Sequence, residues 1–251
     1  MIPFFRKIRK QYADDNKPLK YMRYAIGEIV LVVIGILIAL QINNWNEGRK
    51  QQNLMNSYVS RLISDIQKDT IDIRSNREWL NEAQNIIENT IQLLNKKAID
   101  TTSIPLIENY FTRGWHTYIP IFNDNTYKDL SQTGNMNLLK NTEIRKKIML
   151  YYSRVEDARN SFKINNEWVL PTDVKVTEIT SAMEFSPKTK ALFEGKDKQL
   201  AIKNILFNKD ILERSAAAHY WMNIAVLEDL VVIENEARKL LLSLNNLLNT
   251  E

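Results

Sequence analysis

The residues of this chain that could do chemistry are few and widely spaced. There are two histidines, His116 and His219, and there is no cysteine. A zinc site could use both histidines with a carboxylate such as Glu108 or Asp124, but these histidines lack the i, i+4 spacing that puts two ligands on one helix face. A chain without cysteine also has no thiolate chemistry and no sulfur-ligated metal. We therefore expect both histidines to be core or cap residues, and we expect no metal.

Motifs that mark common active sites are missing from the sequence. It contains no HExxH, no GxSxG, no phosphate-binding glycine-rich loop and no dinucleotide fingerprint. Ser131, in "SQTGN", has no evident base beside it, and the acids recur at spacings that a solvated helix face explains. The sequence thus predicts a protein that is not an enzyme and that binds no cofactor.

An aromatic-rich stretch between residues 103 and 139 is the one candidate for a ligand pocket. Tyrosine and tryptophan combine apolar surface with a hydrogen-bonding tip, as binding sites often do. The possible pocket residues are Tyr110, Trp115, His116, Tyr118 and Tyr127. The same rings could instead form the core of a small cap subdomain, which is the interpretation that we favour.

The elements that would position these residues begin with a long apolar segment, "YAIGEIVLVVIGILIALQINNW", at residues 24–45. Only Glu28 and Gln41 are strongly polar between residues 24 and 42. A helix of this length rises about 28 Å, close to the hydrocarbon thickness of a bilayer. A cleaved signal would have a shorter apolar run followed by a small-residue site, which is missing here. We expect a retained transmembrane helix.

The charges around this segment predict its orientation. Seven basic and two acidic residues precede Tyr24, whereas the rest of the chain holds 27 basic and 28 acidic residues. Because positively charged flanks stay in the cytoplasm, residues 1–23 are expected there and residues 46–251 on the other side, in the periplasm of a Gram-negative cell. A domain without net basic charge also argues against a nucleic-acid partner.

The N-terminal arm, residues 1–23, has its own pattern. Apolar residues recur there every three or four positions between basic ones, which is typical of an amphipathic helix on an anionic cytoplasmic leaflet. The residues that would contact the lipid are Phe4, Phe5, Arg6, Lys7, Ile8, Arg9 and Lys10. A disordered basic tail is the alternative.

Glu28 raises a separate question, because an ionisable group inside a span is often functional. Glu28, Gly35 and Ala39 share one helix face, and a small-x-x-x-small pair lets two helices approach closely. This face predicts packing against a second copy of the chain or against an envelope partner. A lone, lipid-facing anchor with Glu28 at its boundary is the alternative.

The region after the span is expected to be all-α, an elongated helical bundle with a small aromatic-rich cap. Apolar residues repeat every seven positions from Val59 to Leu94, interrupted at the complementary position by Asp69, Asn76 and Thr90. Such patterns predict long bundle helices at about 46–97, 141–183 and 208–248, with Pro171 interrupting or kinking the second. Two inserts, at about 103–139 and 184–207, are expected to form the cap at the far end.

A resemblance supports this organisation. The opening "FFRKIRK…YAIGEIVLVVIGILIALQINNWNE" resembles the N-terminus of an uncharacterised single-pass membrane family of Bacteroidota, and "TYKDLSQTGNMNLLKNTEIRKKIMLYY" is similar to its central motif. The resemblance implies a Gram-negative inner membrane. It implies no activity, since the family is a domain of unknown function.

Three functions are compatible with these features. The first is a non-enzymatic, membrane-anchored scaffold or accessory protein that oligomerises or joins an envelope complex. The second is a sensor-like receptor whose cap binds a ligand. The third is a small oligomeric ion-conducting or proton-coupled protein with Glu28 at its mouth.

Overall fold

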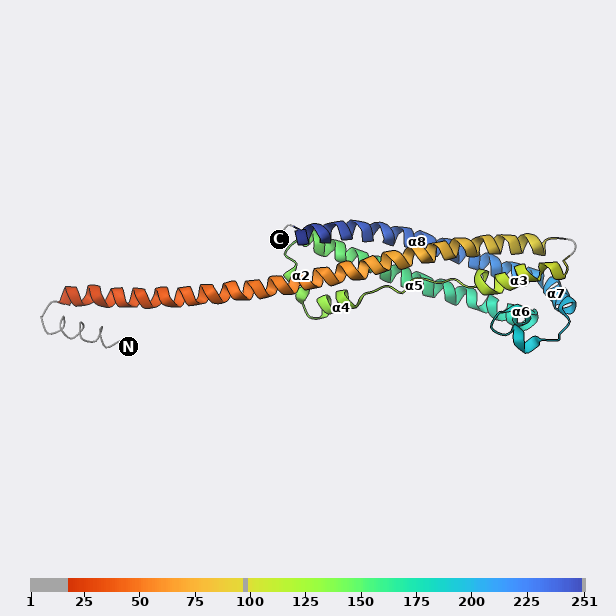
Figure 1. The fold of residues 1–251 in the computed structure, drawn as a ribbon, viewed down its shortest axis with the longest axis horizontal. Helices are drawn as coiled ribbons and strands as arrows, with labels where there is room; N and C mark the ends of the chain where they lie inside the picture. Colours follow the sequence, from red (N-terminus) through yellow and green to blue (C-terminus); the bar gives the residue numbers. More distant parts are fainter. Residues whose placement is uncertain (1–17, 97–98, 250–251) are drawn as a thin grey trace. The chain divides into compact units, whose positions relative to one another are not determined.

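The computed structural model describes residues 18–96 and 99–249 (Figure 1). Throughout these residues every regular element is a helix and no strand occurs, which confirms the all-α class. The chain divides into two compact units, Met1–Asn56 and Ser57–Glu251. The expected lipid-contacting residues of the arm, Phe4 to Lys10, lie outside the described residues.

The longest element is α2, Pro18–Leu94, a helix of 77 residues that contributes to both units. Proline is tolerated at the first position of a helix because its missing N–H would have no partner there. No further proline occurs before Pro105, and the glycines within α2 are few. The segments predicted at 24–45 and 46–97 form one helix, as expected for a span that continues into the bundle.

The second unit is built on three long helices: residues 57–94 of α2, α5 (Thr142–Ile179) and α8 (Lys209–Asn249). The seven-residue repeat of α2 is its buried stripe, since Val59, Ile66, Ile73, Leu80 and Ile87 are all fully buried. α8 buries a matching stripe that includes Leu230, Ala237 and Leu244. The apolar periodicity therefore places the core correctly.

The helix predicted at about 141–183 continues past Pro171, since α5 runs through this proline to Ile179 without an interruption. Proline removes one backbone N–H, so the carbonyl of Glu167, one turn earlier, loses its helical partner. Both Pro171 and Glu167 are exposed, so water can bond that carbonyl. The predicted start of α5 is confirmed, because the Asn141 side chain accepts from the N–H groups of Glu143 and Ile144.

The cap is smaller than predicted. α3 (Ile104–Asn109), the π-helical turn η2 (Tyr110–Gly114), α6 (Ala182–Phe185) and α7 (Lys198–Phe207) gather at the Leu94 end of the second unit. Their shared core includes Ile107, Phe185 and Ile202. Only the first part of the 103–139 insert belongs to this cap.

The rest of that insert lies along the bundle instead. Residues 115–124 are not helical, and α4 (Asn125–Gln132) and η3 (Asn135–Leu138) follow them. Side chains of α2 hold this segment: Arg61 pairs with Asp129, and Asp65 accepts a hydrogen bond from Thr126. The expected placement of all of 103–139 in one cap was wrong because polar side chains of α2, far from the cap, bind its second half.

Candidate functional site

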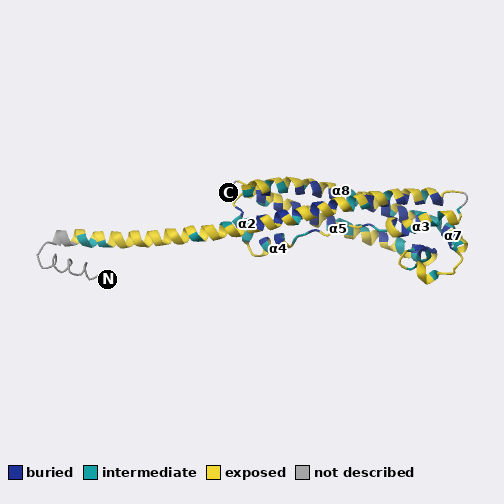
Figure 2. Ribbon diagram, viewed as in Figure 1, coloured by how far each residue is buried: buried dark blue, intermediate teal, exposed yellow. Residues whose placement is uncertain are grey.

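The N-terminal part of α2 exposes its apolar side chains. Figure 2 shows this part of the helix exposed almost throughout, and Ile29, Leu31 and Leu37 are 63%, 69% and 59% exposed. Its most apolar window has a mean hydropathy of 2.6 with none of its residues buried. By length and composition, α2 therefore contains a segment that could cross a membrane.

α8 is also long and apolar enough to cross a membrane, but its window has a mean hydropathy of only 1.2 and is 39% buried. Its buried stripe packs in the bundle, which accounts for its apolar composition. Of the two helices, α2 is the better candidate for a span.

Glu28, Gly35 and Ala39 all lie in the apolar part of α2, at spacings that keep them on one helix face. A Cβ atom added at Gly35 would meet nothing within 4 Å, and the same holds at Gly27. The described part of the first unit therefore leaves space beside these glycines. The packing of this face against another helix stays a prediction.

Four of the five predicted pocket residues form a continuous series of rings. Tyr110 contacts Phe111, Phe111 contacts Trp115, and Trp115 stacks on His116, with centroid separations of 5.1, 5.1 and 6.3 Å. His116 stacks in turn on Tyr118 at 5.8 Å. Tyr110 is fully buried in the cap core, so its ring belongs to the core.

Tyr127 lies apart from this series. It stacks on Tyr152 of α5, with ring centroids 4.3 Å apart and planes within 9°. The two tyrosines line a surface depression of about 570 Å³ together with Asp124 and Arg159. The structure thus does not bring the fifth pocket residue to the other four.

His219 is buried in α8 and bonded on both sides of its ring, as expected for a core histidine. Its Nε2 lies 3.0 Å from Asp173 Oδ2, and its Nδ1 lies 3.5 Å from Thr117 Oγ1. The Ser215 hydroxyl donates to Asp173 at 2.8 Å, and Thr117 donates to Asn223 at 2.7 Å. Burial alone would raise the pKa of the Asp173 carboxyl, but its hydrogen bonds and the charge of His219 lower that pKa overall.

This arrangement is not that of a hydrolytic triad. Ser215 donates to the carboxylate rather than to the imidazole, so no base is placed to activate the hydroxyl.

Burial, with the nearby charges of Lys188 and His219, lowers the pKa of His116. Among the described residues no group of three His, Cys, Asp or Glu side chains could hold a metal ion. The hydrogen bonds of His219, Asp173, Ser215, Thr117 and Asn223 therefore join α5, α8 and the segment around Thr117.

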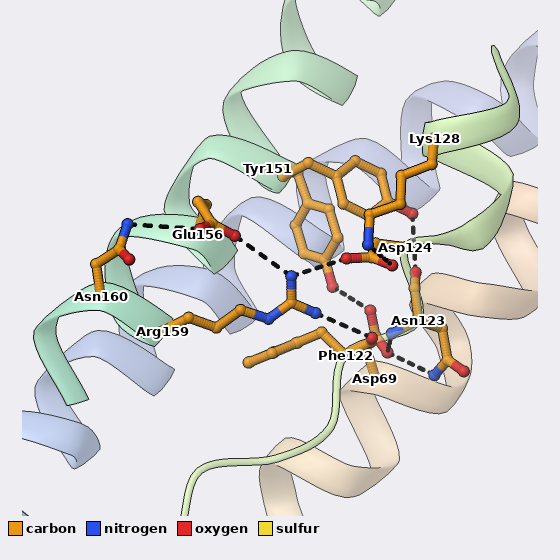
Figure 3. A network of polar contacts seen from close by, with 10 residues as sticks. Asp69, Phe122, Asn123, Asp124, Lys128, Tyr151, Glu156, Arg159 and Asn160 are labelled. Atoms are coloured by element: carbon orange, nitrogen blue, oxygen red, sulfur yellow. Dashed lines mark hydrogen bonds and ion pairs between the residues drawn. The ribbon is translucent and has the colours of Figure 1, made fainter. Parts of the chain in front are cut away.

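Unlike Asp173, which is partly exposed, Asp69 is a fully buried carboxylate that interrupts the apolar pattern of α2. Its Oδ1 accepts from the backbone N–H and the side-chain amide of Asn123, at 2.8 and 2.7 Å. Its Oδ2 accepts from the Tyr151 hydroxyl at 2.7 Å (Figure 3). Burial raises the pKa of the Asp69 carboxyl despite these hydrogen bonds. We call Asp69, Asn123 and Tyr151 the Asp69 network.

Arg159 and Asp124 extend the contacts of this segment, as Figure 3 shows. Arg159 donates to Asp124 Oδ2 at 2.8 Å and to the carbonyl of Phe122 at 3.2 Å, and Lys128 lies 3.0 Å from Asp124 Oδ1. Burial would raise the pKa of the Asp124 carboxyl, but its bonds to Arg159 and Lys128 lower it. Asp124 occupies the N-cap position of α4, but its side chain makes these contacts and no cap bond.

Glu234 is a buried carboxylate that the sequence analysis missed, since its spacing looked like that of a solvated face. It is only 3% exposed, and its oxygens lie 2.6 Å from Arg77, 2.6 Å from Arg238 and 3.3 Å from Arg74. Burial would raise the pKa of Glu234, but the hydrogen bonds and charge of the arginines lower it. This contact joins α2 to α8.

These contacts define a class of protein: an all-α chain with one strongly apolar, exposed helical segment and a bundle whose buried carboxylates bind its own helices. The family model described as "Family of unknown function (DUF6090)" matches residues 28–213. The chain belongs to this family, which confirms the resemblance to an uncharacterised family of unknown function. No curated protein and no solved structure matches the chain.

Proposed function

We propose that this protein is a membrane-anchored, non-enzymatic scaffold or accessory protein of the bacterial envelope, which self-associates or joins an envelope complex. The exposed apolar segment of α2, Met22 to Ile42, carries the proposal. Monomeric soluble proteins rarely expose an apolar surface of this extent, and a bilayer or a partner helix would cover it.

The buried and partly buried carboxylates of the bundle support a structural role for it. Asp69, Asp173 and Glu234 come from different helices, and each binds side chains of another helix or segment. Their hydrogen-bonding capacity is used to join α2, α5, α8 and the 115–124 segment. A bundle held in this way can present a surface without performing a reaction.

Exposed aromatic residues on the bundle also support an interaction role. Trp168 of α5 and Trp221 of α8 are 61% and 50% exposed, and their rings meet edge to face at 5.5 Å. Tryptophan is among the residues most enriched where proteins bind each other. This pair gives the second unit an apolar surface of its own.

In the proposed topology, the N-terminal arm lies on the anionic cytoplasmic leaflet of the inner membrane and the bundle lies in the periplasm. The basic flank before Tyr24 supports this orientation through the positive-inside rule. The absence of catalytic motifs supports a protein that is not an enzyme. No cofactor and no nucleic acid are part of this proposal.

Single cysteines test the packing face in native membranes, because the natural chain has none. We expect Ala39→Cys to form a disulfide-linked dimer on mild oxidation, since Ala39 shares its face with Gly35. Leu37→Cys, on the opposite side of the same helix, is the matched control and should stay monomeric on a non-reducing gel. Equal yields from the two variants would contradict a defined self-packing face.

A further inference from the structure

The segment that contains α7 concentrates positive charge. Residues 186–209 hold six lysines and two acidic residues, although the chain after the span has no basic excess. Two of these lysines are used inside the molecule: Lys190 pairs with Glu108 at 3.4 Å, and Lys198 donates to the carbonyl of Glu184 at 3.2 Å. Three others, Lys188, Lys196 and Lys203, are exposed, and they form no ion pair with any described residue.

The same segment exposes large apolar side chains. Phe207 is 89% exposed, Leu192 is 81% exposed and Leu200 is 64% exposed. α7 buries Ala201, Ile202 and Ile205 in the cap core, so its inward side is already apolar. Leu200, Lys203 and Phe207 recur at spacings of three and four, which puts them on one outward face. The apolar residues of this face have no packing role in the described fold.

A groove brings these two kinds of residue together. It has a volume of about 680 Å³, and its lining includes Leu200, Phe207, Lys196 and Lys203. Two acids also line it, Asp197 and Glu184. Asp197 caps α7 by accepting from the Gln199 N–H at 2.8 Å, so its carboxylate is engaged with the helix. Lys196 lies over the ring of Phe193 at 4.9 Å, and neither Lys196 nor Lys203 is paired with a carboxylate of the described residues. The surface therefore offers ammonium groups without a carboxylate partner beside exposed apolar side chains.

We propose that this α7 face docks on an anionic lipid bilayer, at a second contact separate from the span of α2. Leu200 and Phe207 would enter the boundary between headgroups and acyl chains, and Lys196 and Lys203 would contact lipid phosphates. The inference does not depend on self-association of the span.

The choice of a bilayer over an acidic protein rests on the residue types. The basic residues of this segment are all lysines, whose hydrated, flexible ammonium groups contact phosphates as point charges without a fixed geometry. A protein partner would be expected to meet arginine forks and a packed apolar patch. Phe207 and Leu192 instead project with most of their surface exposed, as side chains that insert into lipid do.

The test uses the full chain held in nanodiscs of phosphatidylcholine. The loaded discs are mixed with sedimentable vesicles of phosphatidylcholine alone or with phosphatidylglycerol, and co-sedimentation is measured. We expect the wild-type protein to bind the anionic vesicles about tenfold more than the neutral ones, because several lysines act together. Lys196→Glu/Lys203→Glu and Leu200→Ser/Phe207→Ser should each remove most of this excess.

Matched controls separate this surface from general charge and exposure. Ile121→Ser replaces an apolar residue that is 88% exposed elsewhere, and Lys163→Glu/Lys175→Glu changes two exposed lysines of α5. Both should bind like the wild type, and circular dichroism should show all variants folded. If the α7 variants keep wild-type binding, the N-terminal arm accounts for it and the proposal is overturned.

A second outcome would also overturn the proposal. Binding of the α7 face to a polyglutamate peptide, without binding to anionic vesicles, would assign this surface to an acidic protein. Neither result affects the cross-linking of Ala39→Cys, so failure here is distinguishable from failure of the proposed function.

Discussion

Replacing Asp69 with alanine is expected to lower the free energy of unfolding by about 3 kcal/mol, because the buried Tyr151 hydroxyl and two N–H donors of Asn123 lose their acceptor. The Tyr151 hydroxyl and the Asn123 N–H both point at this carboxylate, and Tyr151 and Asp69 are fully buried. For a chain of this size the melting temperature should fall by about 10 °C. Thermal unfolding of the full chain in detergent, followed by circular dichroism, measures the change.

Asp72→Ala is the matched control for this substitution. Asp72 lies one turn further along α2 and is exposed, so its loss should change stability by less than about 0.5 kcal/mol. Equal effects of the two substitutions would show that the Asp69 network does not hold the 115–124 segment to the bundle.

Asp69→Asn adds a test of the protonation state. Since the folded-state pKa of Asp69 lies above its usual value, the part of the stability that depends on its protonation is fully present below the unfolded-state pKa of 3.8 and is lost as the pH rises through the folded-state pKa. Asparagine does not titrate there. The stability of the wild type relative to Asp69→Asn should therefore decline as the pH rises through the acidic range, and a constant difference would contradict the raised pKa.

Introducing two acids into the apolar segment is expected to release the protein from the membrane. Val33 and Leu37 are both exposed near the middle of this segment. Each aspartate at the centre of a span costs about 3 kcal/mol of insertion, so Val33→Asp/Leu37→Asp should abolish stable integration. Extraction of membranes at alkaline pH should leave the wild type in the pellet and the variant in the supernatant.

The control pair for this experiment places two aspartates outside the apolar segment. Ile71 and Ile121 are 64% and 88% exposed in the second unit. Ile71→Asp/Ile121→Asp should remain in the membrane pellet like the wild type. A Val33→Asp/Leu37→Asp variant that also resists extraction would contradict the assignment of this segment as the anchor.

The long helices could be predicted from the sequence because their signals are local. The seven-residue repeat of α2 locates its buried stripe, and Asn141 marks the start of α5. The sequence left open whether Pro171 interrupts or kinks α5, because the free-energy cost of a proline inside a helix depends on whether the carbonyl left without a helical partner can reach water. Whether that carbonyl reaches water depends on the outer surface of the bundle rather than on the local sequence.

The polar contacts could be predicted only in part. The sequence shows Asp69 only as an interruption of an apolar pattern, which by itself does not predict that the residue is buried. Its partners, Asn123 and Tyr151, lie 54 and 82 residues away, and no local pattern connects them. Glu234 gave no signal, because Arg74 and Arg77, which bury it, come from another helix.

The aromatic residues illustrate the same limit. Tyr110, Trp115, His116 and Tyr118 are close in sequence and stay close in space. Tyr127 is only nine residues beyond Tyr118, but the segment between them runs along the bundle, where the Asp69 network holds it. Composition alone could not show that one aromatic-rich region divides between two places.

In the proposed function, the anchored chain works in association with another polypeptide. Its most direct test is the mass of the full chain, extracted in a mild detergent and measured by native mass spectrometry. We expect a species of at least twice the chain mass of 29.4 kDa, or a stoichiometric complex with an envelope protein. A strictly monomeric chain with no copurifying partner would contradict it.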